Sequence, residues 1–346
     1  MTLLLWLLGG LVLGVIVERL VGPGRAAEER ALGQEPAGRR PRRRRRRTLR
    51  WIALGFLLLL VAGLVGGYLW ANSVFDKIEK VEVGEHLSGG SSTNYLLVGS
   101  DNGRTEDRQR EGVEGARSDT IMVLRIDGGD ATMMSLNRDL WVTNPATGEK
   151  GRLNAAYNSG PGNLIDAVTE NFGIPIHRYI EIDFASFSDL VDSFGGIDIA
   201  FEHPAFDLGS GLNVTESGTV HLDGEQALAY VRARHYTEVI DGQNVPEGGL
   251  PDVNRTQRQQ TFLRAIMAEA GDKRNPITLM STASKMSGGL RIDDDMTMFQ
   301  AARFAWSMGR LDPETVILPV VPRTTDGGAQ VLEVGPDADP VLDRFR

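Results

Sequence analysis

Cysteine is absent from this chain of 346 residues, and its five histidines are scattered along it. Without cysteine the protein cannot form a disulfide framework, a thiol nucleophile or a cysteine-based zinc site. The scattered histidines argue against a zinc site built on imidazole. The lack of cysteine is compatible with export from the cell but does not establish it.

The sequence also lacks the short motifs of common hydrolases and nucleotide-binding enzymes. It contains no GxSxG nucleophile elbow, no GxxxxGK[ST] loop, no HExxH helix and no EF-hand loop. The fragment Gly160-Pro161-Gly162 is only an incomplete dinucleotide fingerprint and carries little weight. The chemistry must therefore come from other residues.

Charge is distributed unevenly along the chain. Residues 1–70 contain 12 basic and 4 acidic side chains, a net charge of +8, whereas the remainder contains 25 basic and 42 acidic side chains, a net charge of −17. A domain this acidic repels nucleic acid, so nucleic acid is not an expected partner. Any anion that the domain binds must be held by a local cluster of arginines.

One long apolar run, Trp51–Trp70, has the length of a membrane-spanning helix. At about 1.5 Å per residue it covers roughly the 30 Å hydrocarbon core, and tryptophan stands at both ends, where interfacial aromatics are enriched. The arginine-rich segment Arg39–Arg50 precedes it, and the positive-inside rule places that segment in the cytoplasm. We therefore expect a protein anchored in the cell membrane by its N-terminal part, with the domain after Trp70 outside the cell.

A second apolar run, Leu3–Val17, is shorter and has no basic segment before it. We interpret residues 1–17 as a first membrane helix that enters from outside, which makes residues 18–50 the basic cytoplasmic segment between two spans. An extension upstream of the true start is the alternative. A cleavable signal peptide fits less well, because no basic n-region or cleavage site accompanies the run.

The rest of the chain predicts a linker, one α/β domain and a tail. Residues 71–92 are the linker, with a polar helical stalk over Asn72–Glu85, residues 93–322 are the domain, and residues 323–346 are a polar tail. Helix–glycine–strand patterns occur twice and favour helices packed on a sheet. The elements expected in the first part of the domain are the strand Asn94–Ser100, the helix Gly162–Phe172, the strand Arg178–Phe184, the helix Ala185–Phe194 and the strand Ile197–Phe201.

Further along, Pro276–Met308 predicts two helices, and Thr315–Val321 predicts a strand. The run Asp293-Asp294-Asp295 has two interpretations, a metal cluster or the N-terminal capping of a helix. Capping is favoured, because acidic residues before an apolar-periodic run are common at helix starts.

A predicted β-hairpin organises the domain. Its strands, Thr120–Ile126 and Ala131–Asn137, flank Gly128-Gly129, and a two-residue glycine loop favours a tight turn. With this loop the numbers of paired residues sum to 257, so Asp119 lies opposite Arg138 at the open end. The middle of both strands is apolar, which indicates a buried hairpin whose charge gathers at one mouth, either as a structural ion pair or as a site.

Arginines also follow a helix that is expected to begin at Asp223. Arg232 and Arg234 share a face only if this helix ends near Val231 and the chain then becomes extended. A glycine- and proline-rich loop, Thr237–Pro251, is expected after them.

The next helix, Asp252–Gly271, carries cationic side chains on its inward face. Its apolar stripe, extrapolated backwards by three and four residues, leads to Arg255, Arg258 and Gln259. Because the helix dipole disfavours cations at an N-terminus, arginines placed there beside free backbone N–H groups indicate a bound anion. The alternative is a salt bridge to an acidic neighbour.

Two aspartates at strand ends, Asp101 and Asp119, are the remaining candidates for chemistry. Asp101 directly follows a buried strand, where α/β proteins collect functional residues, although a turn or capping role is the alternative. Hard carboxylates suit Mg²⁺, and planar arginines suit bidentate contact with phosphate. Together they predict a magnesium-assisted pyrophosphate site, and outside the cell a lipid-linked phosphate is a better substrate than ATP.

The ordered motifs of residues 94–271 resemble those of the LytR-CpsA-Psr family. The motifs are NYLLVGSD, RSDTIMVLRID, MMSLNRDLWV, GRLNAAYNSG, FSDLVDSFGGID, LDGEQALAYVRARH and DVNRTQRQQ. The membrane helix and the basic segment before it match the layout of that family. The resemblance implies a three-layer α/β/α sandwich with a mixed central sheet, preceded by an N-terminal membrane anchor.

The resemblance also implies a Mg²⁺-dependent phosphotransferase of cell-wall biogenesis, which moves a glycopolymer from a polyprenyl-pyrophosphate carrier onto peptidoglycan. Its partners would be the lipid-linked glycan donor, the peptidoglycan acceptor and membrane lipids. The alternative is a non-catalytic polyprenyl-pyrophosphate receptor that regulates cell-wall assembly.

Roles for individual residues follow from the resemblance of the motifs. Asp101 and Asp119 are the expected magnesium ligands, and together with Arg138 they are the expected catalytic residues. The expected pyrophosphate contacts are Arg117, Arg138, Arg232, Arg234, Arg258 and Gln259, with Arg255 as a weaker candidate.

Three further expectations concern the surroundings of this site. Asp252 would order the helix that it begins, and the apolar lipid pocket would draw on the helices around Ile165–Phe172 and Phe262–Met267. Asn137 stands where the family commonly has proline, so a backbone constraint beside Arg138 is lost. The long charged loop after Asp101 is expected to alter substrate access.

Overall fold

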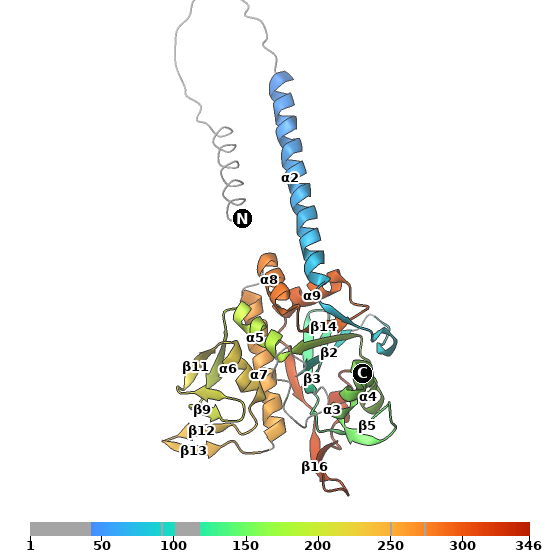
Figure 1. Cartoon of the computed structure of the whole chain (residues 1–346), viewed down its shortest axis with the longest axis vertical. Helices are drawn as coiled ribbons and strands as arrows, with labels where there is room; N and C mark the ends of the chain where they lie inside the picture. The colour runs from blue at the N-terminus through green and yellow to red at the C-terminus, as the bar shows by residue number, and fades with distance from the viewer. Residues whose placement is uncertain (1–42, 91–92, 101–117, 250, 273–274) are drawn as a thin grey trace, which may run out of the picture. The chain divides into compact units, whose positions relative to one another are not determined.

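The computed structural model describes residues 43–90, 93–100, 118–249, 251–272 and 275–346. The chain divides into two compact units, Met1–Val61 and Ala62–Arg346, and the second unit contains the α/β domain (Figure 1). The expected first membrane helix over residues 1–17 and most of the basic segment lie outside the described residues.

Helix α2 (Arg43–Phe75) contains the predicted membrane-spanning segment. Within it, Trp51–Phe75 is long and apolar enough to cross a membrane, and its most apolar window is not buried against protein. Long apolar side chains such as Leu59 and Leu64 are therefore exposed. The prediction of an apolar helix of membrane-spanning length is confirmed.

A seven-stranded mixed sheet forms the middle of the domain, in the order β1-β14-β7-β2-β3-β4-β15. In that order the strands are Glu79–Val81, Leu290–Asp293, Arg178–Asp183, Thr93–Ser100, Ser118–Asp127, Asp130–Ser135 and Glu314–Ile317. Strand β7 is parallel to β2 and β15 is parallel to β4, whereas β3 is antiparallel to both β2 and β4. The sheet is therefore mixed, as predicted.

Strands β3 and β4 form the predicted hairpin in the predicted register. Met122 pairs with Ser135, so the paired numbers sum to 257, and Gly128 has the positive φ (+62°) that a tight turn requires. Strand β4 ends at Ser135, so the ladder stops before it reaches Asp119 and Arg138. The opposition of those two residues stays a prediction.

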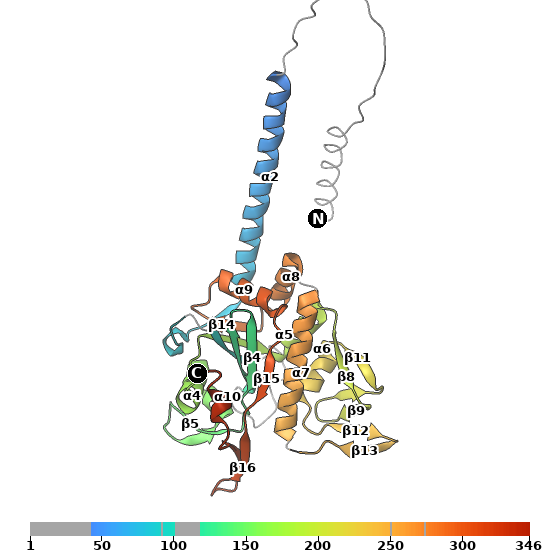
Figure 2. The same ribbon diagram turned by 180° about the vertical axis from the view of Figure 1, so that it is seen from behind.

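Helices cover both faces of the sheet (Figures 1 and 2). Along β3, Ile121 and Val123 join the core on one face, whereas Met122 and Leu124 join the core on the other. The first core is closed by α3 (Leu153–Ala156), α4 (Pro161–Phe172) and α10 (Asp339–Leu342), and the second by α7 (Pro251–Asp272) and α9 (Met298–Met308). This arrangement confirms the predicted three-layer α/β/α architecture.

A smaller β-rich part packs on the helices α5, α6 and α7. Its core combines apolar residues of α5 (Phe184–Ser193) and α6 (Gly224–Arg232) with those of short strands. The strands are β8 (Ile197–Phe201), β9 (Ala205–Asp207), β10 (Leu212–Val214), β11 (Gly218–Leu222), β12 (Thr237–Ile240) and β13 (Gln243–Pro246). The expected start of α6 is confirmed, because Asp223 Oδ1 accepts a hydrogen bond from Gln226 N at 2.9 Å.

Two peripheral segments belong to the domain, contrary to the predictions. The expected helical stalk ends at Phe75, and Glu79–Val81 then adds strand β1 to the edge of the sheet, parallel to β14. The expected polar tail forms β16 (Val320–Thr324), β17 (Gln330–Val334) and α10, and Phe345 is completely buried. The burial of these few apolar side chains outweighs the polar character of both segments.

Two further predictions were wrong, one of a loop and one of a helix cap. The expected loop Thr237–Pro251 contains the β12–β13 hairpin, in which Asp241 and Gly242 have the positive φ values of a tight turn. Strand β14 separates α8 (Pro276–Met286) from α9, and Asp293 is buried in that strand instead of capping a helix. Thr297 caps α9 in its place.

Candidate functional site

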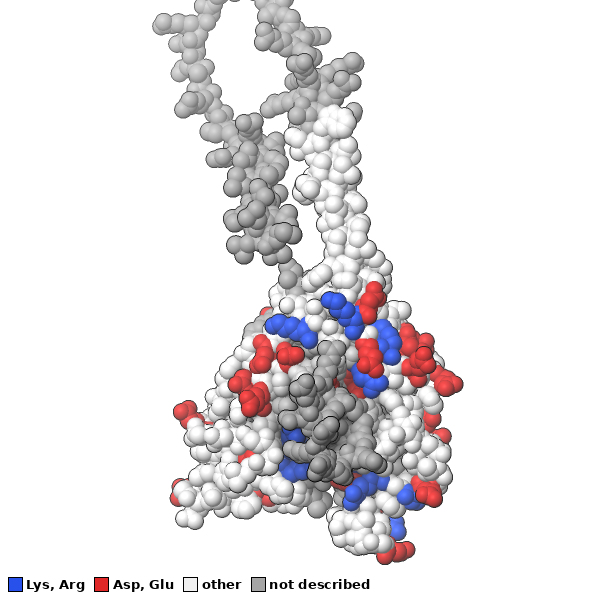
Figure 3. Space-filling model, in the orientation of Figure 1, with Lys and Arg blue, Asp and Glu red and all other residues white. Residues whose placement is uncertain are grey.

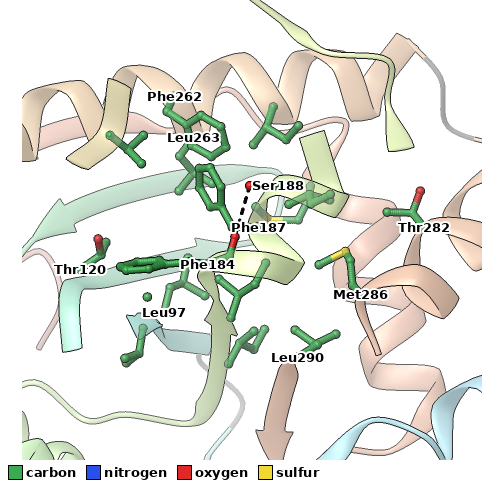
Figure 4. A pocket seen from close by; sticks show the side chains of 18 of the residues that line it. Leu97, Thr120, Phe184, Phe187, Ser188, Phe262, Leu263, Thr282, Met286 and Leu290 are labelled. Carbon is green, nitrogen blue, oxygen red and sulfur yellow. Dashed lines mark hydrogen bonds between the residues drawn. The ribbon is translucent and has the colours of Figure 1, made fainter. Parts of the chain in front are cut away.

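A cavity of about 1590 Å³ lies between the sheet and the helices α5, α7, α8 and α9. Figure 4 shows Leu97 of the sheet on one side and Phe262 of α7 on the other, with Phe184 and Phe187 of α5 projecting between them. The rings of Phe187 and Phe262 stack with centroids 4.4 Å apart. Most of the wall is apolar, which suits a long apolar ligand.

The character of the wall changes along helix α7. Arg255 and Gln259 line the cavity in the first turns of α7, and Phe262, Ile266 and Ala270 line it further along. Because a helix rises about 1.5 Å per residue, this change extends over about 22 Å from the cationic to the apolar end. One cavity therefore offers arginines at one end and hydrocarbon at the other.

Further predicted residues add to the cationic part of the wall. Arg138, Arg232 and Arg234 line the same cavity as Arg255 and Gln259. The Arg232 guanidinium also lies over the Phe184 ring, 4.7 Å from its centroid. Figure 3 shows basic and acidic side chains interspersed on one face, so an anion would depend on this local cluster and not on a broad positive field.

Arg138 is held between neighbouring charges and helix α7. Its side chain is mostly buried, and its Nε lies 3.5 Å from Asp139 Oδ2, while Arg152 contacts the other oxygen of Asp139 at 3.0 Å. The adjacent Asn137 accepts a hydrogen bond from Thr256 Oγ1 of α7 at 3.2 Å. This contact ties the Arg138 segment to the helix that carries Arg255.

Asp207 fixes the chain around Arg234, a role that the sequence reasoning missed. Its Oδ2 accepts hydrogen bonds from the backbone N of Arg234 (2.6 Å) and His235 (2.7 Å), and its Oδ1 accepts from Gly209 (2.7 Å) and Ser210 (3.2 Å). Burial raises the pKa of Asp207, but these four N–H groups outweigh burial and hold the pKa below its usual value. The available signal was an aspartate two residues before glycine, which is typical of an Asx turn.

Arg232 and Arg234 both reach the cavity wall from the C-terminal end of α6 and the residues just after it. Helix α6 ends at Arg232, one residue later than expected, and Ala233 is already extended. Arg234 then follows on extended chain that Asp207 anchors. Both arginines line the cavity, as the sequence required if the helix ended there.

Arg258 does not line the cavity with the other arginines. Its side chain donates to Glu247 Oε2 at 2.6 Å and to the Ala233 carbonyl at 2.7 Å, and it lies over the Tyr236 ring. These contacts match the salt-bridge alternative for a cation on this helix face. They join α7 to the β13 end and to the segment after α6, so Arg258 supports the positions of Arg232 and Arg234.

The structure does not describe the side chains of the predicted carboxylates. Asp101 and Arg117 are outside the described residues, and of Asp119 and Asp252 only the backbone is described. Gly99 pairs with Thr120 and Ser100 pairs with Ser118, so Asp119 is the extra residue of a β-bulge. Ser100 and Ser118, the residues that precede the two aspartates, are therefore paired across adjacent strands beside the cavity wall.

A Mg²⁺ ion near this bulge would need oxygen ligands, usually one or two carboxylates. Among the described residues, no group of three His, Asp or Glu side chains is arranged to hold a metal ion. Asp207 lines the cavity, but its oxygens already accept four N–H groups. The side chains of Asp101 and Asp119 lie outside the described residues, so magnesium binding by them stays a prediction.

A buried polar network supports the strand that leads to Asp101. Glu181 is fully buried and accepts hydrogen bonds from Ser100 Oγ (2.7 Å), Tyr157 (2.5 Å) and Tyr179 (2.8 Å), while Arg291 contacts it at 2.9 Å. Burial and the Glu181 carboxylate raise the pKa of Tyr157 and of Tyr179, so both phenols stay protonated as donors. No local sequence pattern indicates this network, because its members come from distant segments.

Of the two helices that were expected to line an apolar pocket, one lines the cavity and the other does not. Phe262–Met267 of α7 supplies cavity-lining side chains, including Leu263 and Ile266. The segment Ile165–Phe172 of α4 instead packs in the core on the opposite face of the sheet. Its buried face packs against residues of the β-strands and is not accessible to a ligand.

The chain resembles curated proteins over most of the domain. It is 31% identical over 278 residues to the probable cell wall biosynthesis protein LcpB of Corynebacterium glutamicum, which covers 77% of this chain and 62% of that protein. It is also 31% identical over 270 residues to the polyisoprenyl-teichoic acid–peptidoglycan teichoic acid transferase TagV of Bacillus subtilis, covering 70% of this chain and 63% of that protein. The chain therefore spans slightly less than two thirds of each of these relatives.

Solved structures share the fold. The LytR-Csp2A-Psr enzyme from Actinomyces oris matches with a TM-score of 0.63 and 26% identity, covering 78% of this chain and 95% of that one. The crystal structure of B. subtilis TagV matches with a TM-score of 0.57 and 23% identity, covering 74% and 96%. The model of the LytR_cpsA_psr family matches residues 71–330, and this confirms the resemblance of the motifs. The chain belongs to the LytR-CpsA-Psr family.

Proposed function

We propose that this protein is a phosphotransferase that moves a glycopolymer from a polyprenyl-pyrophosphate carrier onto peptidoglycan. The observation that carries the proposal is the single cavity in which Arg138, Arg232, Arg234 and Arg255 meet a long apolar wall. A polyprenyl pyrophosphate has the matching pair of parts, a dianionic or more highly charged head group and a long hydrocarbon chain. Arginines bind such a head group in bidentate fashion, and the apolar wall removes the chain from water.

The names of relatives support the reaction class. Proteins of Bacillus and Enterococcus that are 28 to 31% identical to this chain are named polyisoprenyl-teichoic acid–peptidoglycan teichoic acid transferases. We extend to this chain the class of donor and acceptor that these names contain, a polyisoprenyl-linked glycopolymer and peptidoglycan.

The reaction requires one bond to form and one to break. A hydroxyl of peptidoglycan attacks the sugar-proximal phosphorus, a new P–O bond forms, the phosphoanhydride bond breaks, and polyprenyl phosphate leaves while the hydroxyl loses its proton. Negative charge grows on the transferred and leaving phosphate oxygens, and we assign its stabilisation to Arg138, Arg255 and Arg232, which line the cavity. Gln259 adds an amide donor in the same part of the wall.

Magnesium would act at the same end of the cavity. Bound by Asp101 and Asp119, Mg²⁺ would supply charge neutralisation at the pyrophosphate oxygens. The bulge at Asp119 interrupts the backbone pairing of β2 with β3 beside Gly99 and Thr120, which line the cavity. Arg117 and Arg258 are proposed to complete the cationic surroundings, Arg258 through its support of the segment after α6.

The proposed location is the outer face of the cell membrane. Helix α2 has the length and composition of a membrane span, and the arginines of Arg39–Arg50 favour a cytoplasmic N-terminal side. The domain would then reach lipid-linked donors at the membrane surface and peptidoglycan beyond it.

The test uses the full chain in lipid nanodiscs. It is incubated with Mg²⁺, a polyprenyl-pyrophosphate oligosaccharide and peptidoglycan fragments, and mass spectrometry detects a phosphodiester-linked product. Product that is lost on addition of EDTA supports the magnesium-dependent transferase. Tight binding of the lipid without product, across several donors and acceptors, would replace the transferase by the receptor.

A matched pair of variants on one helix controls for nonspecific loss of charge. Arg255 lines the cavity, whereas Arg264 lies on an exposed part of the same helix, away from the cavity. Arg255→Ala is expected to reduce transfer strongly, and Arg264→Ala is expected to leave it unchanged.

A further inference from the structure

Helix α9 presents an aromatic and cationic stripe to the outside. Phe299, Arg303 and Trp306 follow one another at spacings of four and three residues, which places them on one face of the helix. Phe299 is 71% exposed and Trp306 is 36% exposed. Arg310, just past the end of the helix, lies over the Trp306 ring at 5.6 Å from its centroid. We call Phe299, Arg303, Trp306 and Arg310 the α9 stripe.

The arginines of the α9 stripe have N–H groups that could bind an external anion. In the described part of the chain, neither Arg303 nor Arg310 has an acidic side chain within salt-bridge distance. Exposed aromatic rings beside guanidinium groups that have no described carboxylate partner are typical of helices that lie in the headgroup region of a bilayer. A protein surface in plain water has less reason to expose two large aromatic side chains this close together.

The inner face of the same helix forms part of the cavity wall. Ala301, Phe304, Ala305 and Met308 line the cavity, and Phe304 packs on Tyr95 of the sheet with ring centroids 4.5 Å apart. Trp306 of the α9 stripe lines the same cavity, so the stripe borders the cavity along this helix.

The α9 stripe is continuous with the membrane-spanning helix. The ring of Phe299 stacks on Tyr68 of α2 with centroids 6.5 Å apart. Tyr68 and Trp70 are themselves exposed near the end of the candidate span, where interfacial aromatics are enriched. Both ribbon views place α9 beside the C-terminal end of α2 (Figures 1 and 2).

We propose that the α9 stripe lies in the headgroup layer of the membrane that α2 spans, with Arg303 and Arg310 bound to anionic phospholipid. The domain would then contact the bilayer through the α9 stripe as well as through α2. The aromatic rings would enter the boundary between headgroups and acyl chains, and the guanidinium groups would contact lipid phosphates.

This placement has a consequence for the carrier lipid that rests on the proposed function. The cavity is lined by Ala71, Val74 and Phe75 at the end of α2 as well as by α9. With α9 at the bilayer surface, a polyprenyl chain could pass from the membrane between α2 and α9 into the cavity without crossing water. Membrane contact by the α9 stripe can be measured without any substrate, so it can fail or succeed independently of the transferase.

The absence of cysteine makes a depth measurement simple. A single cysteine introduced by Phe299→Cys in the full chain gives one site for a spin label, and Trp306→Cys gives a second reporter. Val245→Cys is the matched control, because Val245 is also an exposed apolar residue but lies on β13, at the other end of the domain from α9 in both views (Figures 1 and 2). The accessibility of each label to oxygen, which concentrates in lipid, is compared with its accessibility to a water-soluble nickel chelate.

The proposal predicts a specific pattern in nanodiscs. Labels at positions 299 and 306 should be protected from the nickel chelate and accessible to oxygen, and the label at position 245 should show the reverse. Phosphatidylglycerol should increase the depth at position 299 relative to phosphatidylcholine alone, and Arg303→Gln together with Arg310→Gln should remove that increase. Each arginine near an anionic surface is expected to change the partition by about fivefold.

Two results would overturn the proposal. Equal exposure to the nickel chelate at positions 299, 306 and 245 would show that α9 lies in water. Protection of position 299 from both reagents would show that protein, such as a second copy of the chain, covers the stripe instead of lipid.

Discussion

Asp207 Oδ2 accepts a hydrogen bond from the backbone N of Arg234 at 2.6 Å, and this contact fixes one of the arginines that line the cavity. Three further backbone N–H groups share the two oxygens of the same buried carboxylate. The geometry of the cationic end of the cavity thus depends on an acidic residue that does not face the ligand as a free charge.

Replacement of Asp207 tests this dependence. Asp207→Ala leaves four backbone donors without their acceptor and is expected to lower the free energy of unfolding by about 3 kcal/mol. Thermal unfolding followed by circular dichroism measures the loss. Transfer should also fall, and an unchanged melting temperature would contradict the role of Asp207.

The same residue gives a prediction for pH. The folded-state pKa of Asp207 lies below its ordinary value of 3.8, so its contribution to stability is present above that value and is lost as the pH falls through the lower folded-state pKa. The difference in stability between the wild type and Asp207→Asn should therefore be constant near neutral pH and shrink below about pH 4. Unfolding curves at a series of pH values check this, and a difference that grows on acidification would contradict it.

Arg138 is expected to act on the reaction and not on the fold. Arg138→Ala should reduce transfer by about 100-fold or more, since it removes a donor from the charge that grows on the phosphate oxygens. Its circular dichroism spectrum and melting temperature should stay close to those of the wild type. Full activity of this variant would refute the assignment of Arg138, and Arg264→Ala serves as the control for lost positive charge.

The apolar part of the cavity predicts discrimination by chain length. Ala305→Phe inserts a ring into the cavity wall and is expected to weaken binding of a long polyprenyl phosphate by about tenfold, without affecting a soluble pyrophosphate. Ala268→Phe, on the exposed side of α7, is the control of equal chemistry. Equilibrium binding of the two ligands to each variant tests the prediction, and equal losses for both ligands would argue against a separate lipid compartment.

Two glutamates that contact the same arginine are expected to contribute unequally to the stability of the protein. Arg291 contacts both Glu181, which is fully buried, and Glu79, which is mostly exposed. Glu181→Ala should cost about 3 kcal/mol of stability because it leaves buried partners unsatisfied, whereas Glu79→Ala should cost less than about 1 kcal/mol. Chemical unfolding of the two variants measures the difference, and similar losses would show that burial of Glu181 does not matter.

The sequence predicted the features that rest on local pattern. The apolar run Trp51–Trp70 and the Gly128-Gly129 turn each depend on residues close together in the chain, and the structure confirms the helix and the hairpin register. The inward face of α7 followed from helical periodicity, which correctly placed Arg255 and Gln259 beside Phe262.

The features that failed depend on contacts between distant segments. Strands β1 and β14 have only three and four residues; β1 pairs with β14, and β14 pairs in turn with β7. The burial of Phe345 depends in the same way on a core built from earlier helices and strands. Periodicity over so few residues carries no signal, so a helical stalk and a polar tail were predicted instead.

The site shows the same division. Arginines could be selected by type and spacing, but the exclusion of Arg258 from the cavity depends on Glu247, whose position is set by the β12–β13 hairpin. The hairpin itself had a local signal in Asp241-Gly242, which a glycine- and proline-rich composition obscured. The roles of Asp207 and Glu181 required the fold.

The most direct test of the account is the structure of the full chain with a polyprenyl pyrophosphate bound. We expect the pyrophosphate within hydrogen-bonding distance of Arg138 and Arg255, and the prenyl chain along Phe262–Met267, directed towards α9. A lipid bound outside this cavity, or bound in it with the head group at the apolar end, would contradict the account.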